Sequence, residues 1–290
     1  MAFRTVVVQN RCKLEFSINY LICRKGNDVT RIVIDEIKTL VIDSLQVSIT
    51  SGLINELLKK KVKILFIDEK HNPLGEMIPY QNNYYSFRKI KEQIAISKEK
   101  KDYLWKKITE RKIINQANNL YIKNLRSEFD LLIDYSQNVE LGDITNREGH
   151  SAKVYFNGLF GKDFSRDQEN NINKFLNYGY SIILSSINRE LKILGYLTEL
   201  GIHHIGESNP FNLSCDLIEP LRPLVDLLVI ENMVNDDNYK LEFIEMLSKK
   251  VKYNDKEIFL ENAIRLYVED MMHYLIYGIE EKIKFIDYEL

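Results

Sequence analysis

Several residue types that mark particular protein classes are scarce in this chain of 290 residues. Its three cysteines (Cys12, Cys23 and Cys215) are far apart and form no CxxC pair, which argues against a disulfide framework or a cysteine zinc site and suits a reducing, cytoplasmic compartment. Five prolines and twelve glycines are few, which favours long helices over a turn-rich β fold. No apolar run reaches the ~18 residues of a membrane span, and the N-terminal residues carry no signal-peptide pattern.

Neither positive nor negative charge is in large excess, because the net charge at pH 7 is −2. The distribution is uneven: residues 88–112 hold ten Lys and Arg against four acids, a surplus of six positive charges. This basic band is consistent with a surface that faces phosphates. A solvated helix face with i,i+4 ion pairs explains it equally well. The basic residues of the band are Arg88, Lys89, Lys91, Lys98, Lys100, Lys101, Lys106, Lys107, Arg111 and Lys112.

The first part of the chain has the pattern of β-strands. Between residues 4 and 48, β-branched or alternating runs such as RTVVV and YLICR are separated by Asn, Asp, Lys and Gly. A helix is predicted from Ser51, which would cap it, and VKILFID from Val62 is typical of a buried strand. Pro73, Gly75 and Pro79 then punctuate the sequence.

From about Ser86 the apolar residues recur with the period of a helix, and the first such segment is free of Pro and Gly to about Leu125. Further helices are expected at 148–160, 171–199, 220–233, 239–249 and 257–288. The fold class predicted is α+β: a small β-rich N-terminal domain over 1–79, a polar linker over 80–86 and an all-α domain over 87–290.

One segment of interest, TNREGHSAKVYFNGLFGKDFSRD, starts at Thr145. The spacing Thr145-x-x-Glu148 fits a capping box, in which Glu148 would bond back to the N–H of the cap. This structural role competes with any functional role for Glu148. His150, one turn into the predicted helix, is expected to be exposed rather than to bind a metal.

A second segment, GIHHIGESNPFNLSCDLIEPLRP, holds two of the five histidines side by side. We expect a helix to end at Gly201 and the next to begin around Glu219, because prolines follow there. A histidine of the intervening loop can then meet a carboxylate, and these donors together suit Mg²⁺, Mn²⁺ or Zn²⁺. A buried histidine bonded to a buried carboxylate without metal would have the same spacing.

Three blocks of the sequence resemble, in this order, a known family. NREGHSAKVYFNGLFGKDFSRD, LNYGYSIILSSINRELKILG and GIHHIGESNPFNLSCDLIEPLRPLVD are similar to the CRISPR-associated spacer-integration nuclease family, the universal integrase subunit of CRISPR adaptation. The opening FRTVVVQNRCKLEF resembles its type II branch. The resemblance implies a β-sandwich-like domain used for dimerisation and an α-helical catalytic domain.

The resemblance also implies a site for Mg²⁺ or Mn²⁺ held by Glu148, His204 and Glu219. Asp216 would support this site or lie at a helix start. Because adjacent residues on a loop point in different directions, His203 is expected to be a wall or DNA-side residue instead of a ligand. The side chains expected to contact the DNA backbone are Lys153, Arg166 and Arg222. Those expected to pack or position groups around the site are Tyr155, Tyr178 and Tyr180.

The implied reaction is DNA integration by a metal-dependent endonuclease/integrase. The 3′-hydroxyl of a short double-stranded fragment attacks a phosphodiester of the CRISPR repeat, without ATP, and the chain has no P-loop. Homodimers would flank a dimer of a small CRISPR-associated partner protein. Two alternatives stay open: a metal-dependent nuclease that hydrolyses branched or single-stranded DNA, and a non-catalytic DNA-binding scaffold in which Glu148 only caps and His204 only packs.

Overall fold

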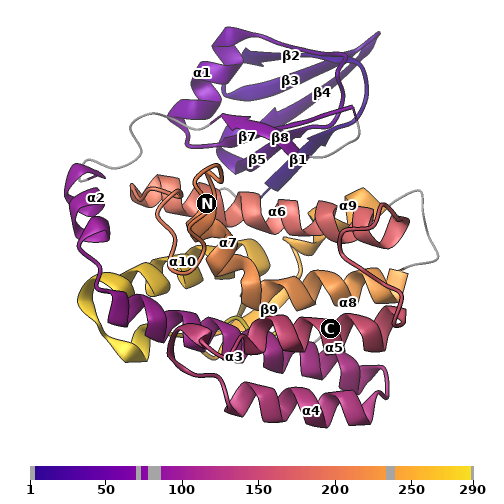
Figure 1. Cartoon of the computed structure of the whole chain (residues 1–290). Helices are drawn as coiled ribbons and strands as arrows, with labels where there is room; N and C mark the ends of the chain where they lie inside the picture. The colour runs from indigo at the N-terminus through magenta and orange to yellow at the C-terminus, as the bar shows by residue number, and fades with distance from the viewer. Residues whose placement is uncertain (1–3, 70–72, 78–85, 233–238, 289–290) are drawn as a thin grey trace. The chain divides into compact units, whose positions relative to one another are not determined.

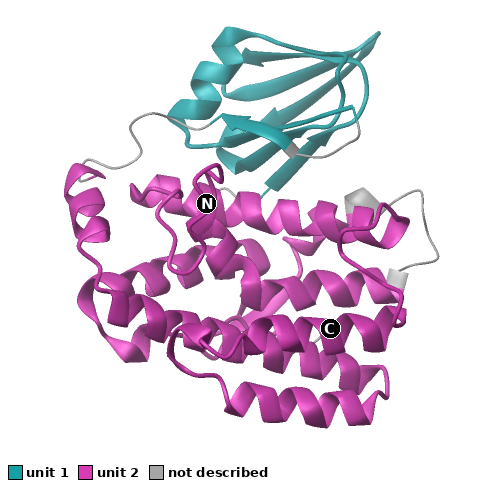
Figure 2. Cartoon of the chain, in the orientation of Figure 1, with its two compact units in different colours: residues 1–84 teal, residues 85–290 magenta. Residues whose placement is uncertain are grey.

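The computed structural model describes residues 4–69, 73–77, 86–232 and 239–288. The chain divides into two compact units, Met1–Tyr84 and Tyr85–Leu290, coloured separately in Figure 2. The predicted linker lies outside the described residues except for Ser86. Strands in the first unit and mainly helices in the second confirm the α+β class (Figure 1). No helix within the described ranges is long and apolar enough to cross a membrane.

The first unit consists of two four-stranded sheets and helix α1 (Ser51–Lys59). One sheet has the order β1-β5-β7-β8 and the other β4-β3-β2-β6. Their strands are β1 (Arg4–Val8), β2 (Cys12–Ser17), β3 (Tyr20–Lys25), β4 (Asp28–Val33), β5 (Ile37–Ile42), β6 (Val47–Ile49), β7 (Lys63–Ile67) and β8 (Pro73–Met77). The short β6 and β8 were not anticipated from the sequence pattern.

Strand β5 lies in the middle of the first sheet and is buried at every position, as expected for a strand with parallel neighbours on both sides. Leu14, Leu40 and Leu53 bring both sheets and α1 into one hydrophobic core. The cap of α1 is Thr50, whose hydroxyl accepts from the N–H of Leu53 at 3.3 Å. The predicted cap was therefore one residue too late.

The second unit is mainly helical. Its helices are α2 (Ser86–Ile94), α3 (Lys98–Ile122), α4 (Arg126–Gln137), α5 (Arg147–Phe160), α6 (Asn171–Leu194), α7 (Asn212–Ile218), α8 (Arg222–Asn232), α9 (Tyr239–Met246) and α10 (Leu260–Tyr277), with short 3₁₀ turns η2 (Leu141–Asp143), η3 (Glu219–Leu221) and η4 (Glu280–Lys282). Two strands, β9 (Lys250–Tyr253) and β10 (Lys256–Phe259), form a hairpin.

Three expectations for this unit are corrected. The segment after Ser86 is two helices, because Ser97 caps α3 by accepting from the N–H of Lys100. The unit is not all-α, since β10 replaces the predicted helix start at 257 and the helix ends at Tyr277. Helix α6 ends at Leu194, where Gly195 adopts the left-handed conformation, and not near Gly201.

Helix α3 packs against α4, α5 and α8 and fixes the elements that carry the site (Figure 1). The amide of Asn115 donates to the carbonyl of Pro220 at 2.7 Å. The amide of Asn119 donates to the carbonyl of Pro223 and to the hydroxyl of Tyr155, both at 2.7 Å. These bonds join α3 to the proline-containing turn and to α5.

Candidate functional site

Glu148 stands in the first turn of α5, and its carboxylate does not cap the helix. The cap is built by Asp143, whose carboxylate accepts from the N–H groups of Arg147 at 2.8 Å and Glu148 at 3.0 Å. Asn146 adds a bond from the N–H of Gly149 at 3.2 Å. The predicted capping box is therefore wrong, because the N-cap residue is Asn146 rather than Thr145, and the N–H of Glu148 bonds to Asp143.

The carboxylate of Glu148 instead shares a cation with Glu219. The ammonium of Lys112, on α3, donates to both carboxylates and is only 7% exposed. Glu219 is the first residue of η3, which follows α7 directly, so a helix precedes it as well as follows it. Arg222 Nε donates to Glu219 Oε1 at 2.8 Å.

The charges in this cluster stabilise one another. Burial by itself would raise the pKa of Glu219, but Arg222 and Lys112 outweigh it and lower that pKa to about 2. Burial also opposes the charge of Lys112, yet the two glutamates raise its pKa above the usual value. Glu219 and Lys112 are therefore both ionised at neutral pH.

His204 is held by Asp216, which is completely buried on α7. Asp216 accepts from the backbone N–H groups of Ile202 (2.5 Å), His203 (3.1 Å) and His204 (3.0 Å), and its Oδ1 lies 2.6 Å from His204 Nδ1. The bond to Asp216 raises the pKa of His204 against the effect of burial. Among the described residues Nε2 has no hydrogen-bond partner, so this nitrogen is available for another contact.

His203 and His204 point in different directions. The ring of His203 stacks on Trp105 with centroids 4.2 Å apart and planes 3° apart. Trp105 also meets the ring of His204 edge-on, at 5.8 Å. His150 is exposed, as predicted. The stack on Trp105 accounts for a wall position of His203.

A cavity of about 230 Å³ opens beside the two glutamates. The polar side chains that line it are Lys112, Gln116, Glu148, Arg166, Tyr180, Glu219, Arg222 and Asp226. The Tyr180 ring lies 5.3 Å from the Arg166 guanidinium and 4.6 Å from that of Arg222, and its hydroxyl donates to Asp226. Burial raises the pKa of Asp226 to about 6. Two arginines beside carboxylates give the cavity both anion-binding and cation-binding groups.

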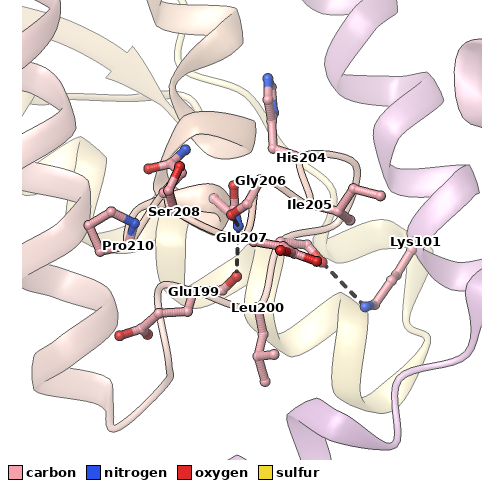
Figure 3. A pocket seen from close by; sticks show the side chains of 12 residues that line it. Lys101, Glu199, Leu200, His204, Ile205, Gly206, Glu207, Ser208 and Pro210 are labelled. Atoms are coloured by element: carbon pink, nitrogen blue, oxygen red, sulfur yellow. Dashed lines mark hydrogen bonds between the residues drawn. The ribbon is translucent and has the colours of Figure 1, made fainter.

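A second cavity of about 440 Å³ follows the loop before α7 and includes His204 (Figure 3). On its rim, Lys101 Nζ donates to the carbonyl of Gly201 at 3.2 Å.

Lys153 is exposed on α5 and lines neither cavity. Tyr155 and Tyr178 are buried core residues. Of the three expected DNA contacts, only Arg166 and Arg222 therefore face the glutamates.

The donor types fit a hard divalent cation, since two carboxylates converge on one positive charge and an imidazole nitrogen is available nearby. The described residues nevertheless contain no group of three His, Cys, Asp or Glu side chains arranged to hold a metal. In this structure Lys112 pairs with both carboxylates, and Arg222 pairs with that of Glu219. Glu148 and Glu219 are thus brought together, while His204 lines the other cavity within electrostatic reach of Glu219.

Several residues of the basic band have partners within the protein. Arg88 pairs with Glu92 and Lys106 with Glu110, both at i,i+4 spacing, as the helix-face alternative predicted. Lys100 Nζ donates to the carbonyls of Leu275 (3.3 Å) and Ile276 (2.9 Å) at the end of α10. Several members of the band therefore already have partners within the protein.

Sequence reasoning missed Lys112, Gln116, Asp226 and Trp105 as parts of this region. Lys112 was counted only as a member of the basic band. A signal was present, because Lys112, Asn115, Gln116 and Asn119 follow i, i+3, i+4 and i+7 spacing and form one polar stripe along a long helix. A polar stripe that is buried must bond to something specific.

Comparison with known proteins identifies the family of the chain. The family described as CRISPR associated protein Cas1 matches residues 5–260. The chain belongs to the Cas1 family. A CRISPR-associated endonuclease Cas1 of Neisseria meningitidis serogroup C is 35% identical over 237 residues, which are 79% of this chain and 76% of the relative. One from Pyrobaculum aerophilum is 27% identical over 75% of this chain and 78% of its own length.

Solved structures of Cas1-type proteins share the fold. A casposase bound to integration product superimposes with a TM-score of 0.79 at 22% identity, covering 99% of this chain and 95% of that chain. A Cas1 protein from Thermotoga maritima gives 0.74 at 17% identity over 94% of this chain and 97% of its own. A Cas6-RT-Cas1–Cas2 complex gives 0.75 at 17% identity over 97% of this chain and 36% of that chain.

Proposed function

We propose that this chain is the integrase of CRISPR adaptation, joining 3′-hydroxyl ends of short double-stranded DNA fragments to the CRISPR repeat by transesterification. The observation that carries the proposal is the convergence of Glu148 and Glu219 on one cation, in a cavity edged by Arg166 and Arg222, in a Cas1-family chain. The casposase structure, solved with its integration product, supports the same reaction class.

In this proposal Glu148, Glu219 and His204 would hold Mg²⁺ or Mn²⁺, and Asp216 would orient the imidazole through Nδ1. The bound cation supplies activation of the attacking hydroxyl and neutralises charge at the scissile phosphate. Arg166 and Arg222 would bind the phosphate backbone. One phosphodiester bond forms as another breaks, and the proton lost by the attacking hydroxyl balances the one gained by the displaced 3′-oxygen. No ATP is consumed.

The proposed assembly is a cytoplasmic homodimer joined through residues 1–79, with two dimers bridged by a dimer of a small CRISPR-associated partner protein. The matched complex that contains Cas1 and Cas2 supports a partner of this kind. Both the CRISPR repeat and the spacer fragment are double-stranded DNA.

The test is an integration assay with a labelled fragment, a plasmid that carries a repeat, the small partner and saturating Mn²⁺. Glu148→Ala, His204→Ala and Glu219→Ala should each slow integration by ~10³-fold or more, because each removes a ligand of the catalytic ion. His203→Ala is the matched control and should lose less than ~10-fold. Circular dichroism verifies that all four variants fold.

Two outcomes would contradict the proposal. Cleavage of branched or single-stranded DNA without strand joining would indicate a hydrolytic nuclease. Wild-type DNA binding with neither cleavage nor Mn²⁺ binding would indicate a scaffold. If His203→Ala is as inactive as His204→Ala, the assignment of His204 as the ligand is wrong.

A further inference from the structure

Lys112 is a nearly buried lysine paired with two carboxylates. Its side chain is 7% exposed, and its ammonium donates to the two carboxylates to which the proposed function assigns metal binding. A lysine buried between glutamates neutralises their mutual repulsion. The same charge would oppose any second cation at those oxygens, so metal binding requires that the ammonium leave.

The backbone around Lys112 cannot supply that movement. Helix α3 is tied to the turn that carries Glu219 by the bonds of Asn115 and Asn119 to two proline carbonyls. Asn119 also ties it to Tyr155 on α5, the helix that carries Glu148. The flexible four-carbon stem of Lys112 is therefore the part that can move.

A second acceptor for the ammonium lies one helical turn away. Gln116 is 1% exposed, and its Oε1 is buried without a hydrogen-bond partner. Its side chain and that of Lys112 both line the 230 Å³ cavity, and i,i+4 residues lie on the same face of a helix. A buried carbonyl oxygen without a donor is unfavourable, so it would gain from an incoming ammonium.

The rest of the cavity fits an anion at that second position. Arg166 and Arg222 face it from two other elements, and the ring of Tyr180 lies against both guanidinium groups. An ammonium turned toward Gln116 would add a third positive group to these arginines. A phosphate diester of DNA matches this set of donors.

We propose that Lys112 exchanges partners during the reaction cycle: it holds Glu148 and Glu219 together in the metal-free protein, and once those carboxylates engage the metal its ammonium bonds to Gln116 Oε1 and the DNA phosphate. The inference rests on the proposed function. Lys112 is then a positioning residue for the carboxylates and a phosphate contact in the loaded complex.

The experiment is calorimetric titration of the full-length, metal-free protein with Mn²⁺. Lys112→Met keeps the length of the stem and removes the charge, so its Kd for Mn²⁺ should fall by ~10-fold or more relative to wild type. Gln116→Met removes the second acceptor, so its Kd should rise by several-fold. Lys107→Met, whose ammonium pairs with Glu110 at 2.9 Å on the same helix, is the control and should leave Kd unchanged.

A second readout is duplex DNA binding with Mn²⁺ present. Lys112→Met should reduce the slope of log affinity against log salt by about one phosphate contact, while Lys107→Met should not. If Lys112→Met does not fold, Gln116→Met still tests the exchange, because a purely structural lysine predicts no change in its Mn²⁺ affinity.

The outcomes separate this inference from the proposed function. If wild type binds Mn²⁺ and Lys112→Met binds it equally or more weakly, the exchange is wrong and the proposed function stands. If neither protein binds Mn²⁺, both are wrong. Binding by Lys112→Met alone would mean that the lysine blocks the site permanently, which contradicts both the exchange and a metal site in the wild-type protein.

Discussion

Asp216 is a carboxylate whose hydrogen-bonding capacity is used entirely by one loop. Its oxygens accept from three consecutive backbone N–H groups and contact His204 Nδ1. The carboxylate therefore sets both the path of residues 202–204 and the orientation of one imidazole. This leaves Asp216 without a free lone pair of good geometry, which fits a supporting role better than that of a direct ligand.

Asp226 is a buried carboxylate whose charge is not fully compensated. Burial raises its pKa to about 6 from an ordinary value near 3.8, so the folded protein binds a proton more readily than the unfolded chain. Stability is therefore lost as pH rises through this range. Asp226→Asn should stabilise the protein more at pH 8 than at pH 4.5, by on the order of 2 kcal/mol, because the amide has no charge to bury.

Urea unfolding followed by far-UV circular dichroism, which reports mainly on the helical unit, measures this difference. Asp163→Asn, at an exposed position, is the control and should shift stability equally at both pH values. A stabilisation of Asp226→Asn that is the same at both pH values would mean that Asp226 stays charged without penalty.

At the scale of elements, the helices could be predicted where an apolar stripe met a clear boundary. Helix α5 and the start of α6 follow their periodicity closely. The break before α3 was missed because Ser97 caps a helix without any proline or glycine nearby. The β9–β10 hairpin was missed although Asn254 and Asp255, with φ of 52° and 60°, are typical residues of a two-residue turn.

The site could be predicted from sequence only as separate segments. The blocks that contain Glu148 and Glu219 were identifiable through their resemblance to a known family, because the local pattern at Glu148 also fits a helix cap. Their common partner Lys112 lies on α3, more than thirty residues before the nearer of them, so no local spacing relates it to either. Long-range contacts of this kind depend on how helices pack, which periodicity alone does not specify.

The pairing of charges along α3 leads to a prediction for DNA binding. Arg166→Gln should reduce the slope of log affinity against log salt by about 1, because Arg166 faces the cavity. Lys106→Gln should leave the slope unchanged, since Lys106 pairs with Glu110. Titration of a fluorescently labelled duplex at several salt concentrations measures both slopes. If Lys106→Gln reduced the slope more than Arg166→Gln, the result would indicate that the basic band is a DNA-binding surface.

At the scale of the whole molecule, the β4-β3-β2-β6 sheet of the β unit exposes several apolar side chains. Ile18 is 85% exposed at the β2–β3 turn, and Tyr20 and Val29 are 39% and 45% exposed on β3 and β4. Ile18 also has a φ of 44°, which is unfavourable for a β-branched residue. An apolar residue kept at a strained and exposed position suggests that a partner covers it.

We therefore expect the homodimer to depend on Ile18. Ile18→Asn should raise the stability of the isolated subunit by about 1 kcal/mol, because Asn tolerates positive φ, and should weaken dimerisation. Light scattering over a dilution series gives the dimer fraction, and thermal unfolding of dilute protein gives subunit stability. Exposed Ile144→Asn, in the helical unit, is the control. A wild-type monomer at tens of micromolar, about where weak dimers form, would contradict the homodimer.

The stack of Trp105 on His203 has an optical consequence, because Trp105 is the only tryptophan of the chain. Its indole also lies edge-on to His204, so its emission reports on the histidine pair without any label. Paramagnetic Mn²⁺ bound at His204 should quench that emission, and diamagnetic Mg²⁺ should leave it nearly unchanged. His204→Ala should abolish the quenching by Mn²⁺, and quenching that persists in this variant would place the ion elsewhere.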